Sequence, residues 1–171
     1  MSTDQKGNIA EAAVVLAAVR LGIDVYRPVG EGGRCDLIFG IGDGMLRVQC
    51  NWAPRDGDVV LVRCYSCRRN RDGLLKRTYK RGEIDAFAAY CCAVDRCYLL
   101  PFELFAGRSQ ISLRLCPTKN KQSSGINWAS LFEFEATLGR PGAIAQLGER
   151  LPGRQEGTGS SPVGSIGSSR V

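Results

Sequence analysis

One pattern in the first third of the chain limits its fold more than any other. Residues 35–41 form an apolar run, Gly42-Asp43-Gly44 is a strong hairpin-turn signal, and residues 45–52 alternate between apolar and polar side chains. One face of the second segment would carry Leu46, Val48 and Cys50, and the other face Arg47, Gln49 and Asn51. Because strand side chains point alternately to opposite faces, this pattern predicts two antiparallel strands with one apolar face.

The remaining segments predict an α/β sandwich with a mixed central sheet flanked by helices. Residues 7–21 are rich in helix formers and end at Gly22, which predicts a first helix. Further strands are expected at residues 23–29, 58–65, 96–100 and 111–115, with 58–65 central or near-central. Further helices are expected at residues 83–94, with Ile84, Phe87, Ala88 and Cys91 on one face, and at residues 128–138. This order does not fit a repeated βαβ array.

A change of composition divides the chain near residue 139. Residues 1–138 are predicted to form one domain, and the Gly- and Ser-rich residues 139–171 a disordered tail. With codons chosen freely, residues 142–165 can be spelled as the paired arms of a tRNA. We therefore expect the tail to be translated from an adjacent or interrupted tRNA gene, and we exclude it from reasoning about the fold.

The positive charge of the chain is concentrated in one segment. The whole chain has a formal net charge of +6, and residues 63–81 hold eight basic residues and one acid. A local basic patch on a near-neutral body is typical of a protein that binds a polyanion, although a solvated basic loop is the alternative. The segment is expected to be a loop or an extended hairpin. The expected phosphate contacts are Arg63, Arg68, Arg69, Arg71, Lys76 and Arg77, with Lys119 and Lys121 as a second set.

Eight cysteines and no histidine limit the metal chemistry that the chain can perform. No secretory signal and no run of eighteen apolar residues is visible, so we expect a cytoplasmic protein with reduced thiols and no membrane span. Most of the cysteines lie in apolar contexts, where a free thiol packs as a small hydrophobic group. A small zinc-containing interaction domain that uses Cys64, Cys67, Cys92 and Cys97 remains an alternative.

A spaced set of polar residues predicts a site for phosphodiester hydrolysis. Asp36 at a strand edge suits a direct ligand of Mg²⁺, and the Gln49 side chain and the Cys50 backbone carbonyl can complete the oxygen ligands. Glu11 can hold a metal-bound water from the helix. Asn51 stands where this chemistry needs a lysine, so the missing charge would have to come from elsewhere; Lys6 and Arg47 are the candidates.

Four sequence motifs resemble those of the PD-(D/E)XK nucleases, most closely the intron-encoded homing endonuclease branch, which is related in fold to archaeal Holliday-junction resolvases. The motifs are K-G-x-x-x-E, G-x-D-V-Y-R-P-x-G-E-G, C-D-L-I-F and L-R-V-Q-C-N-W-A, and the likeness covers about residues 5–136. The resemblance implies a restriction-endonuclease-like α-β-β-β-α-β core and a cofactor of Mg²⁺ or Mn²⁺. It also implies that Glu11, Asp36 and Gln49 are the metal-site residues and that Asn51 is the lysine equivalent.

Two functions follow from the resemblance. The first is a divalent-metal-dependent endonuclease that acts on double-stranded DNA and is weakened or inactivated by Asn51. The second is a non-catalytic DNA-binding module of the same fold. Cutting both strands needs two active sites or two sequential nicks, so a homo-oligomer with a two-fold axis is expected.

Overall fold

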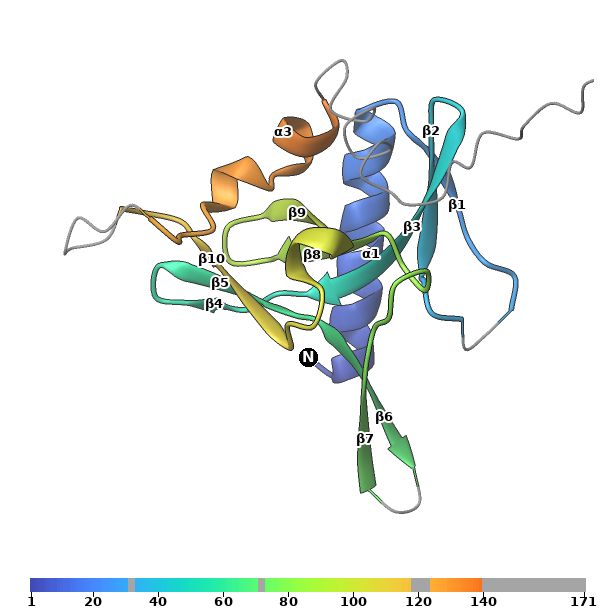
Figure 1. The fold of residues 1–171 in the computed structure, drawn as a ribbon, viewed down its shortest axis with the longest axis horizontal. Helices are drawn as coiled ribbons and strands as arrows, with labels where there is room; N and C mark the ends of the chain where they lie inside the picture. The colour runs from blue at the N-terminus through green and yellow to red at the C-terminus, as the bar shows by residue number, and fades with distance from the viewer. Residues whose placement is uncertain (31–32, 71–72, 118–123, 140–171) are drawn as a thin grey trace, which may run out of the picture.

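A long helix, α1 (Thr3–Arg20), packs along one face of a sheet in the computed structural model, which describes residues 1–30, 33–70, 73–117 and 124–139 (Figure 1). The helix begins earlier than residue 7 because Ser2 and Gln5 form a capping box that satisfies its first amides. It ends where Gly22 adopts a positive φ of 74°. Ala10, Val14 and Ala18 form its buried stripe.

The central sheet is mixed, as the sequence predicts. Its strand order is β1-β2-β3-β8-β9, and β3 and β8 run parallel while the other neighbours are antiparallel. The strands are β1 (Asp24–Tyr26), β2 (Leu37–Ile41), β3 (Gly44–Trp52), β8 (Ala86–Cys91) and β9 (Arg96–Pro101). Leu46 and Val48 are buried toward α1, so the alternation expected along β3 is confirmed.

One expected helix is wrong: residues 83–94 contain the strand β8. The segment is rich in alanine, and its apolar residues also fit a helical spacing, which led to the expectation. In the structure, Ala86, Phe87, Ala88 and Ala89 are buried on both faces of the sheet. A short, continuous apolar run is typical of a strand that is covered on both sides and pairs in parallel, as β8 does with β3.

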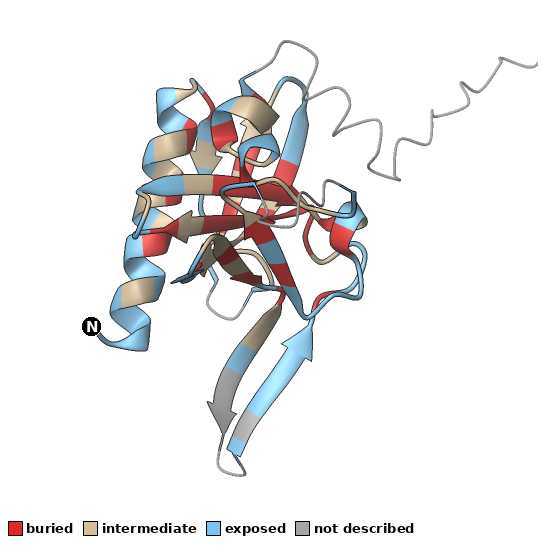
Figure 2. Ribbon diagram, turned by 90° about the vertical axis from the view of Figure 1, so that its left-hand side faces the viewer, coloured by how far each residue is buried: buried red, intermediate tan, exposed pale blue. Residues whose placement is uncertain are grey.

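A second, three-stranded sheet packs on the face of the central sheet that α1 does not cover. Its order is β10-β5-β4, with β10 (Gln110–Arg114), β5 (Val59–Arg63) and β4 (Arg55–Asp56). The strand expected at residues 58–65 therefore exists, but it lies in the middle of this second sheet and not in the central one. Val60 and Val62 pack with Phe87 and Leu100 in the core between the two sheets (Figure 2).

The segments after β9 are shorter than expected. The helix expected at residues 128–138 is divided into a 3₁₀ turn, η1 (Ala129–Leu131), and α3 (Phe134–Leu138), and a short helix, α2 (Phe102–Phe105), follows β9. Phe134 packs edge-on against Phe39 with the ring centroids 6.1 Å apart. The predicted tail lies outside the described residues apart from Gly139, so its origin stays a prediction.

The basic segment forms an arm that extends from the body. Strands β6 (Tyr65–Asn70) and β7 (Gly73–Thr78) pair with each other in a two-stranded sheet, and Figures 1 and 2 show this hairpin standing away from the rest of the molecule. The extended-hairpin form of the expectation is therefore confirmed. Within the described residues, no helix is long and apolar enough to cross a membrane.

Candidate active site

Asp36 lies directly before β2 and faces the edge of β3. Its backbone amide donates to the Val48 carbonyl at 2.9 Å, which fixes the start of the strand. Its carboxylate Oδ2 accepts hydrogen bonds from the Cys50 amide at 2.8 Å and from Gln49 Nε2. The structure therefore brings Asp36, Gln49 and the backbone of Cys50 together, as the sequence predicts.

The Gln49 amide nitrogen occupies the place where a cation would fit. It contacts Asp36 Oδ2 and also lies 3.3 Å from the Cys50 carbonyl oxygen, so two oxygens point at one donor. These two oxygens and the amide oxygen of Gln49 are the hard ligands that Mg²⁺ prefers. A half-turn of the amide would exchange the donor for the acceptor. The donor set present in this chain therefore fits a divalent cation.

A second carboxylate adds negative charge to the same region. Burial raises the pKa of Asp36, and the charge of Glu11 raises it further, while hydrogen bonds from Cys50 and Gln49 act in the opposite direction. Glu11 reaches this region from α1 and is one-quarter exposed. It forms an ion pair with Arg27, which follows β1. Two neighbouring carboxylates that are partly withdrawn from water favour the binding of a cation.

Asn51 lies two residues beyond Gln49 on β3. Its Nδ2 atom is buried and has no hydrogen-bond partner among the described residues. A buried donor without a partner costs about 1–3 kcal/mol, so such groups are uncommon unless they serve a ligand. Asn51 thus offers a hydrogen-bond donor at the position where the sequence lacks a lysine, but it brings no positive charge.

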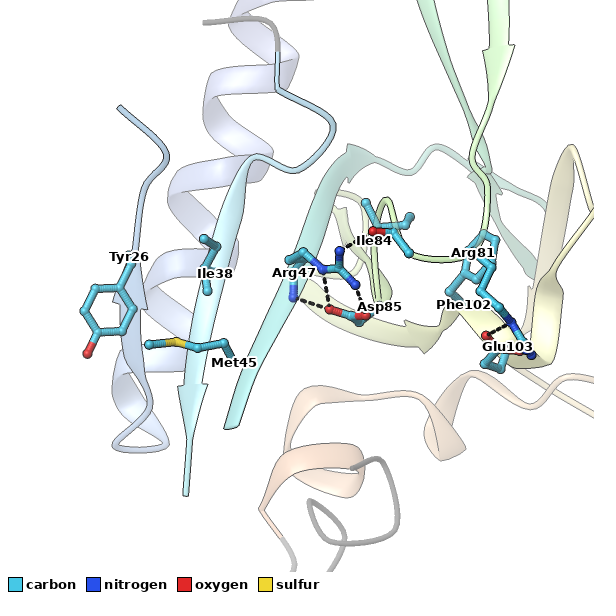
Figure 3. A pocket seen from close by; sticks show the side chains of 10 residues that line it. Tyr26, Ile38, Met45, Arg47, Arg81, Ile84, Asp85, Phe102 and Glu103 are labelled. Atoms are coloured by element: carbon cyan, nitrogen blue, oxygen red, sulfur yellow. Dashed lines mark hydrogen bonds and ion pairs between the residues drawn. The ribbon is translucent and has the colours of Figure 1, made fainter. Parts of the chain in front are cut away.

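Arg47, one of the two expected sources of the missing charge, is paired with another carboxylate in the structure. Its Nε and Nη2 atoms donate to Asp85 at 2.9 and 2.8 Å, its backbone amide donates to the same carboxylate at 2.8 Å, and its Nη1 donates to the Gly82 carbonyl (Figure 3). The guanidinium is therefore committed to Asp85. Lys6 and Glu11 lie on different faces of α1, because a separation of five residues is about 1.4 turns.

A pocket of about 550 Å³ is lined in part by Arg47 and Asp85 (Figure 3). Its charged groups are already paired: Arg47 with Asp85, and Arg81 with Glu103 at 3.0 Å. The rest of its lining includes Tyr26 and Ile38. Because its cations are neutralised by neighbouring carboxylates, this pocket is a poor phosphate site.

The zinc alternative is wrong. Cys64 is buried in the core between the sheets, Cys67 is exposed on β6, and Cys92 and Cys97 lie on the β8–β9 hairpin. In the ranges that the structure describes, no group of three or more His, Cys, Asp or Glu side chains could hold a metal ion. The Asp36 region is a different kind of site, because its expected ligands include an amide and a backbone carbonyl.

Sequence reasoning missed an arginine cluster at the root of the arm. Arg34 donates to Ser66 Oγ at 3.0 Å, to the Thr78 carbonyl at 2.8 Å and to Glu83 at 3.1 Å. Its guanidinium also lies 4.1 Å from the centre of the Tyr79 ring. These partners are distant in sequence, so no local signal could have identified them. The cluster fixes both strands of the arm two residues before Asp36.

The basic side chains of the arm differ in how far they are neutralised. Lys76 is exposed and lies 5.2 Å from the centre of the Tyr65 ring, which leaves its charge open to a ligand. Arg77 is paired with Glu83 at 2.6 Å. Arg63 is exposed at the end of β5. The side chains of Arg68 and Arg69, and the whole of Arg71, Lys119 and Lys121, lie outside the described part of the chain.

Comparison with known proteins identifies the family. Residues 1–135 match the PD-(D/E)XK endonuclease family, so the chain belongs to that family. The fold is similar to that of a bacterial homing endonuclease, I-Ssp6803I, with a TM-score of 0.67 and 24% identity over 87% of this chain and 97% of that one. This likeness confirms the expected mixed α/β fold. No curated protein matches the chain.

Proposed function

We propose that this protein is a divalent-metal-dependent DNA endonuclease. Its family supports a nuclease function, and PD-(D/E)XK nucleases generally use divalent metals. The observation that carries the proposal is the convergence of Asp36, Gln49 and the Cys50 carbonyl on one point, with Glu11 close enough to raise the pKa of Asp36. Mg²⁺ or Mn²⁺ is the ion proposed, since the Asp36 carboxylate, the Cys50 carbonyl and, after a half-turn of its amide, Gln49 offer hard oxygens.

The residues of the site would divide the chemistry among them. Asp36, Gln49 and the Cys50 carbonyl would hold the ion directly, and Glu11 would hold one of its waters. The bound ion would lower the pKa of a water and offset charge on the phosphate. Hydrolysis adds the oxygen of a water to phosphorus and breaks the bond to one bridging oxygen, which takes up a proton. The Asn51 amide would orient the attacking water by donating a hydrogen bond.

Asn51 should make this reaction slow. An amide can position the water, but it adds no positive charge where the transition state gathers negative charge. Losing one preorganised stabilising group of this kind typically costs about 10²–10³-fold in rate. We therefore propose a slow nuclease, and Asn51→Lys should raise its cleavage rate.

The arm formed by β6 and β7 is the proposed DNA contact. The major groove of B-DNA admits a two-stranded β-ribbon, and the arm is an isolated ribbon of that kind. Lys76 is exposed and without a carboxylate partner in the described residues, so it can reach a phosphate. Arg63, Arg68, Arg69, Arg71 and Arg77, with Lys119 and Lys121, remain the other proposed contacts.

We also propose that the protein acts as a homo-oligomer that forms through α1. Ile9, Leu16 and Val19 are 39%, 52% and 56% exposed on the side of the helix turned away from the sheet. Exposed apolar side chains that lie near one another on a surface often mark a place where a partner binds. Two copies would supply the two sites that cutting both strands requires. Leu16→Glu should shift the mass measured by light scattering toward the monomer, and an unchanged mass would exclude this surface.

A non-catalytic DNA-binding module is the second candidate, and the loss of charge at position 51 favours it. Nicking of supercoiled plasmid in Mg²⁺ separates the two functions, with wild type, Asn51→Lys and Asp36→Asn compared side by side. We expect slow nicking by wild type, faster nicking by Asn51→Lys, and none by Asp36→Asn. If Asn51→Lys binds DNA but does not cut it, the module is the better description.

A further inference from the structure

A cation that the sequence did not single out lies against the candidate metal site. Arg27 follows β1, and its Nη1 atom forms an ion pair with Glu11 Oε1. The Arg27 side chain is 62% exposed, so it can leave Glu11 without the loss of a packed core contact. One carboxylate of the proposed site, that of Glu11, is thus paired with an exposed arginine.

The surroundings of Cys50 show that Arg27 and both carboxylates share one region. The pKa of the Cys50 thiol is raised by burial and by the negative charges of Asp36 and Glu11, and Arg27 acts on it in the opposite direction. The amide of the same residue donates to Asp36. Arg27 thus lies within electrostatic range of Cys50, and it forms its ion pair with Glu11.

Two other arginines, Arg47 and Arg34, already hydrogen-bond to residues outside the proposed metal site. Arg47 is held by Asp85 and the Gly82 carbonyl. Arg34 is held by Ser66, Glu83 and the Thr78 carbonyl, and its side chain is 19% exposed. Arg27 differs from both because its contact is a single exposed ion pair with a group that the metal ion would itself engage.

We propose that Arg27 supplies the positive charge that Asn51 cannot, by binding the scissile phosphate. Glu11 would help to hold a divalent cation, and the Arg27 guanidinium, once free of Glu11, would donate to two non-bridging phosphate oxygens. Arginine suits this role because its planar fork matches the geometry of a phosphate. Arg27 and the metal ion would thus compete for the Glu11 carboxylate. Binding of the metal ion would free the Arg27 guanidinium to contact the phosphate. This inference rests on the proposed nuclease function.

The test compares Arg27→Gln with a matched control. Arg96→Gln removes an arginine of similar exposure, 55%, from a similar ion pair with Glu133 on another part of the surface. Circular dichroism verifies the fold of each variant. Supercoiled plasmid nicking gives the rate, and electron paramagnetic resonance of free Mn²⁺ gives metal affinity without DNA. Wild type, Arg27→Lys, Glu11→Gln and Asn51→Lys complete the set.

We expect Arg27→Gln to reduce the nicking rate by about 10–100-fold, because one charged stabiliser is lost. Its Mn²⁺ affinity should equal or exceed that of wild type, because the competitor for Glu11 is gone, whereas Glu11→Gln should bind Mn²⁺ more weakly. Arg27→Lys should retain part of the rate, and Arg96→Gln should match wild type. In the Asn51→Lys background, Arg27→Gln should cost less.

Three results would overturn the inference. Arg27→Gln could nick as fast as Arg96→Gln, it could lose Mn²⁺ affinity as Glu11→Gln does, or wild type could fail to nick under conditions where Asn51→Lys succeeds. The proposed function fails in a different way: neither wild type nor Asn51→Lys would then nick DNA, and neither would bind Mn²⁺.

Discussion

Two polar clusters share strand β3, and they have opposite characters. At Arg47, every polar group has a partner: the guanidinium and the backbone amide both reach Asp85, and the Gly82 carbonyl takes a further hydrogen bond. Farther along the strand, the Asp36 site contains a buried donor that is left unsatisfied. The Asn51 amide nitrogen has no partner among the described residues, and the pKa of Asp36 is raised because its charged form is poorly solvated.

The difference separates a structural cluster from a functional one on the same strand. A satisfied ion pair joins two strands and holds the crossover from β3 to β8 in place. An unsatisfied cluster costs stability, and the chain retains it where a ligand restores the missing contacts. The two ends of β3 should therefore respond in opposite ways to neutral substitutions.

Asp36→Asn should have the largest effect on activity. We expect cleavage to fall by about 10³-fold or more, because a direct ligand is lost and the metal-activated water is lost with it. Plasmid nicking in Mg²⁺ measures this loss. Asp85→Asn is the matched control in the same sheet, and cleavage by that variant should remain within about tenfold of wild type wherever it is folded.

Asp85→Ala should have the largest effect on stability. It leaves the Arg47 guanidinium and the Arg47 amide without their acceptor, and Asp85 is only 9% exposed. Breaking a buried pair from one side costs about 3–5 kcal/mol, and because Arg47 is 40% exposed we expect about 2–3 kcal/mol here. Urea unfolding measures the change, and a loss below about 0.5 kcal/mol would contradict the structural role.

Asn51→Leu should stabilise the fold, whereas Asp85→Ala should destabilise it. The substitution removes a buried donor that has no partner and keeps a side chain of similar size. We expect a gain of about 1 kcal/mol in the free energy of unfolding, together with a loss of cleavage. A destabilised Asn51→Leu would show that the amide has a partner in solution.

Basic side chains of the arm also differ in whether they already form an ion pair. Lys76→Ala should lower the slope of log affinity against log salt by about one unit, because a phosphate contact is lost. Arg77→Ala should lower the slope by less, because Arg77 is already paired with Glu83. Fluorescence anisotropy titrations at several salt concentrations measure both slopes. Equal slopes for the two variants would contradict the view that Lys76 is a better phosphate contact than Arg77.

The smallest expected effect is on the pH dependence of stability. The pKa of Asp36 is raised above its ordinary value of 3.8, so the folded state binds this proton more tightly than the unfolded state does. The contribution of Asp36 to stability is therefore present at acidic pH and is lost as the pH rises through the raised pKa. Asp36→Asn should be more stable than wild type at pH 7, and the difference should vanish below the ordinary pKa of 3.8. Thermal unfolding across this range measures the difference.

The sequence could predict the Asp36 site because the site depends on local alternation. Gln49 and Asn51 share a face of β3 through the period of the strand, and the Gly42 turn places Asp36 beside them. It could not predict Asp85 as the partner of Arg47, since that contact requires β8 to be a strand. The alanines of β8 fit a helix equally well, and burial on both faces decided the outcome. The pairing of Arg27 with Glu11 likewise depends on how the chain after β1 lies against α1.

The arm and the Asp36 site share one support, and this has a consequence for how target preference can change. Arg34 fastens Ser66 on one strand of the arm and the Thr78 carbonyl on the other, close to Asp36 in the chain. Beyond these anchors the arm has little part in the two cores, as the 57% exposure of Leu75 illustrates. Its outer residues are therefore free to diverge, or to be exchanged by design, at little cost in folding. Exchanging the anchors would disturb the arm and the proposed active site together. An exchanged arm should therefore begin after Ser66 and end before Thr78.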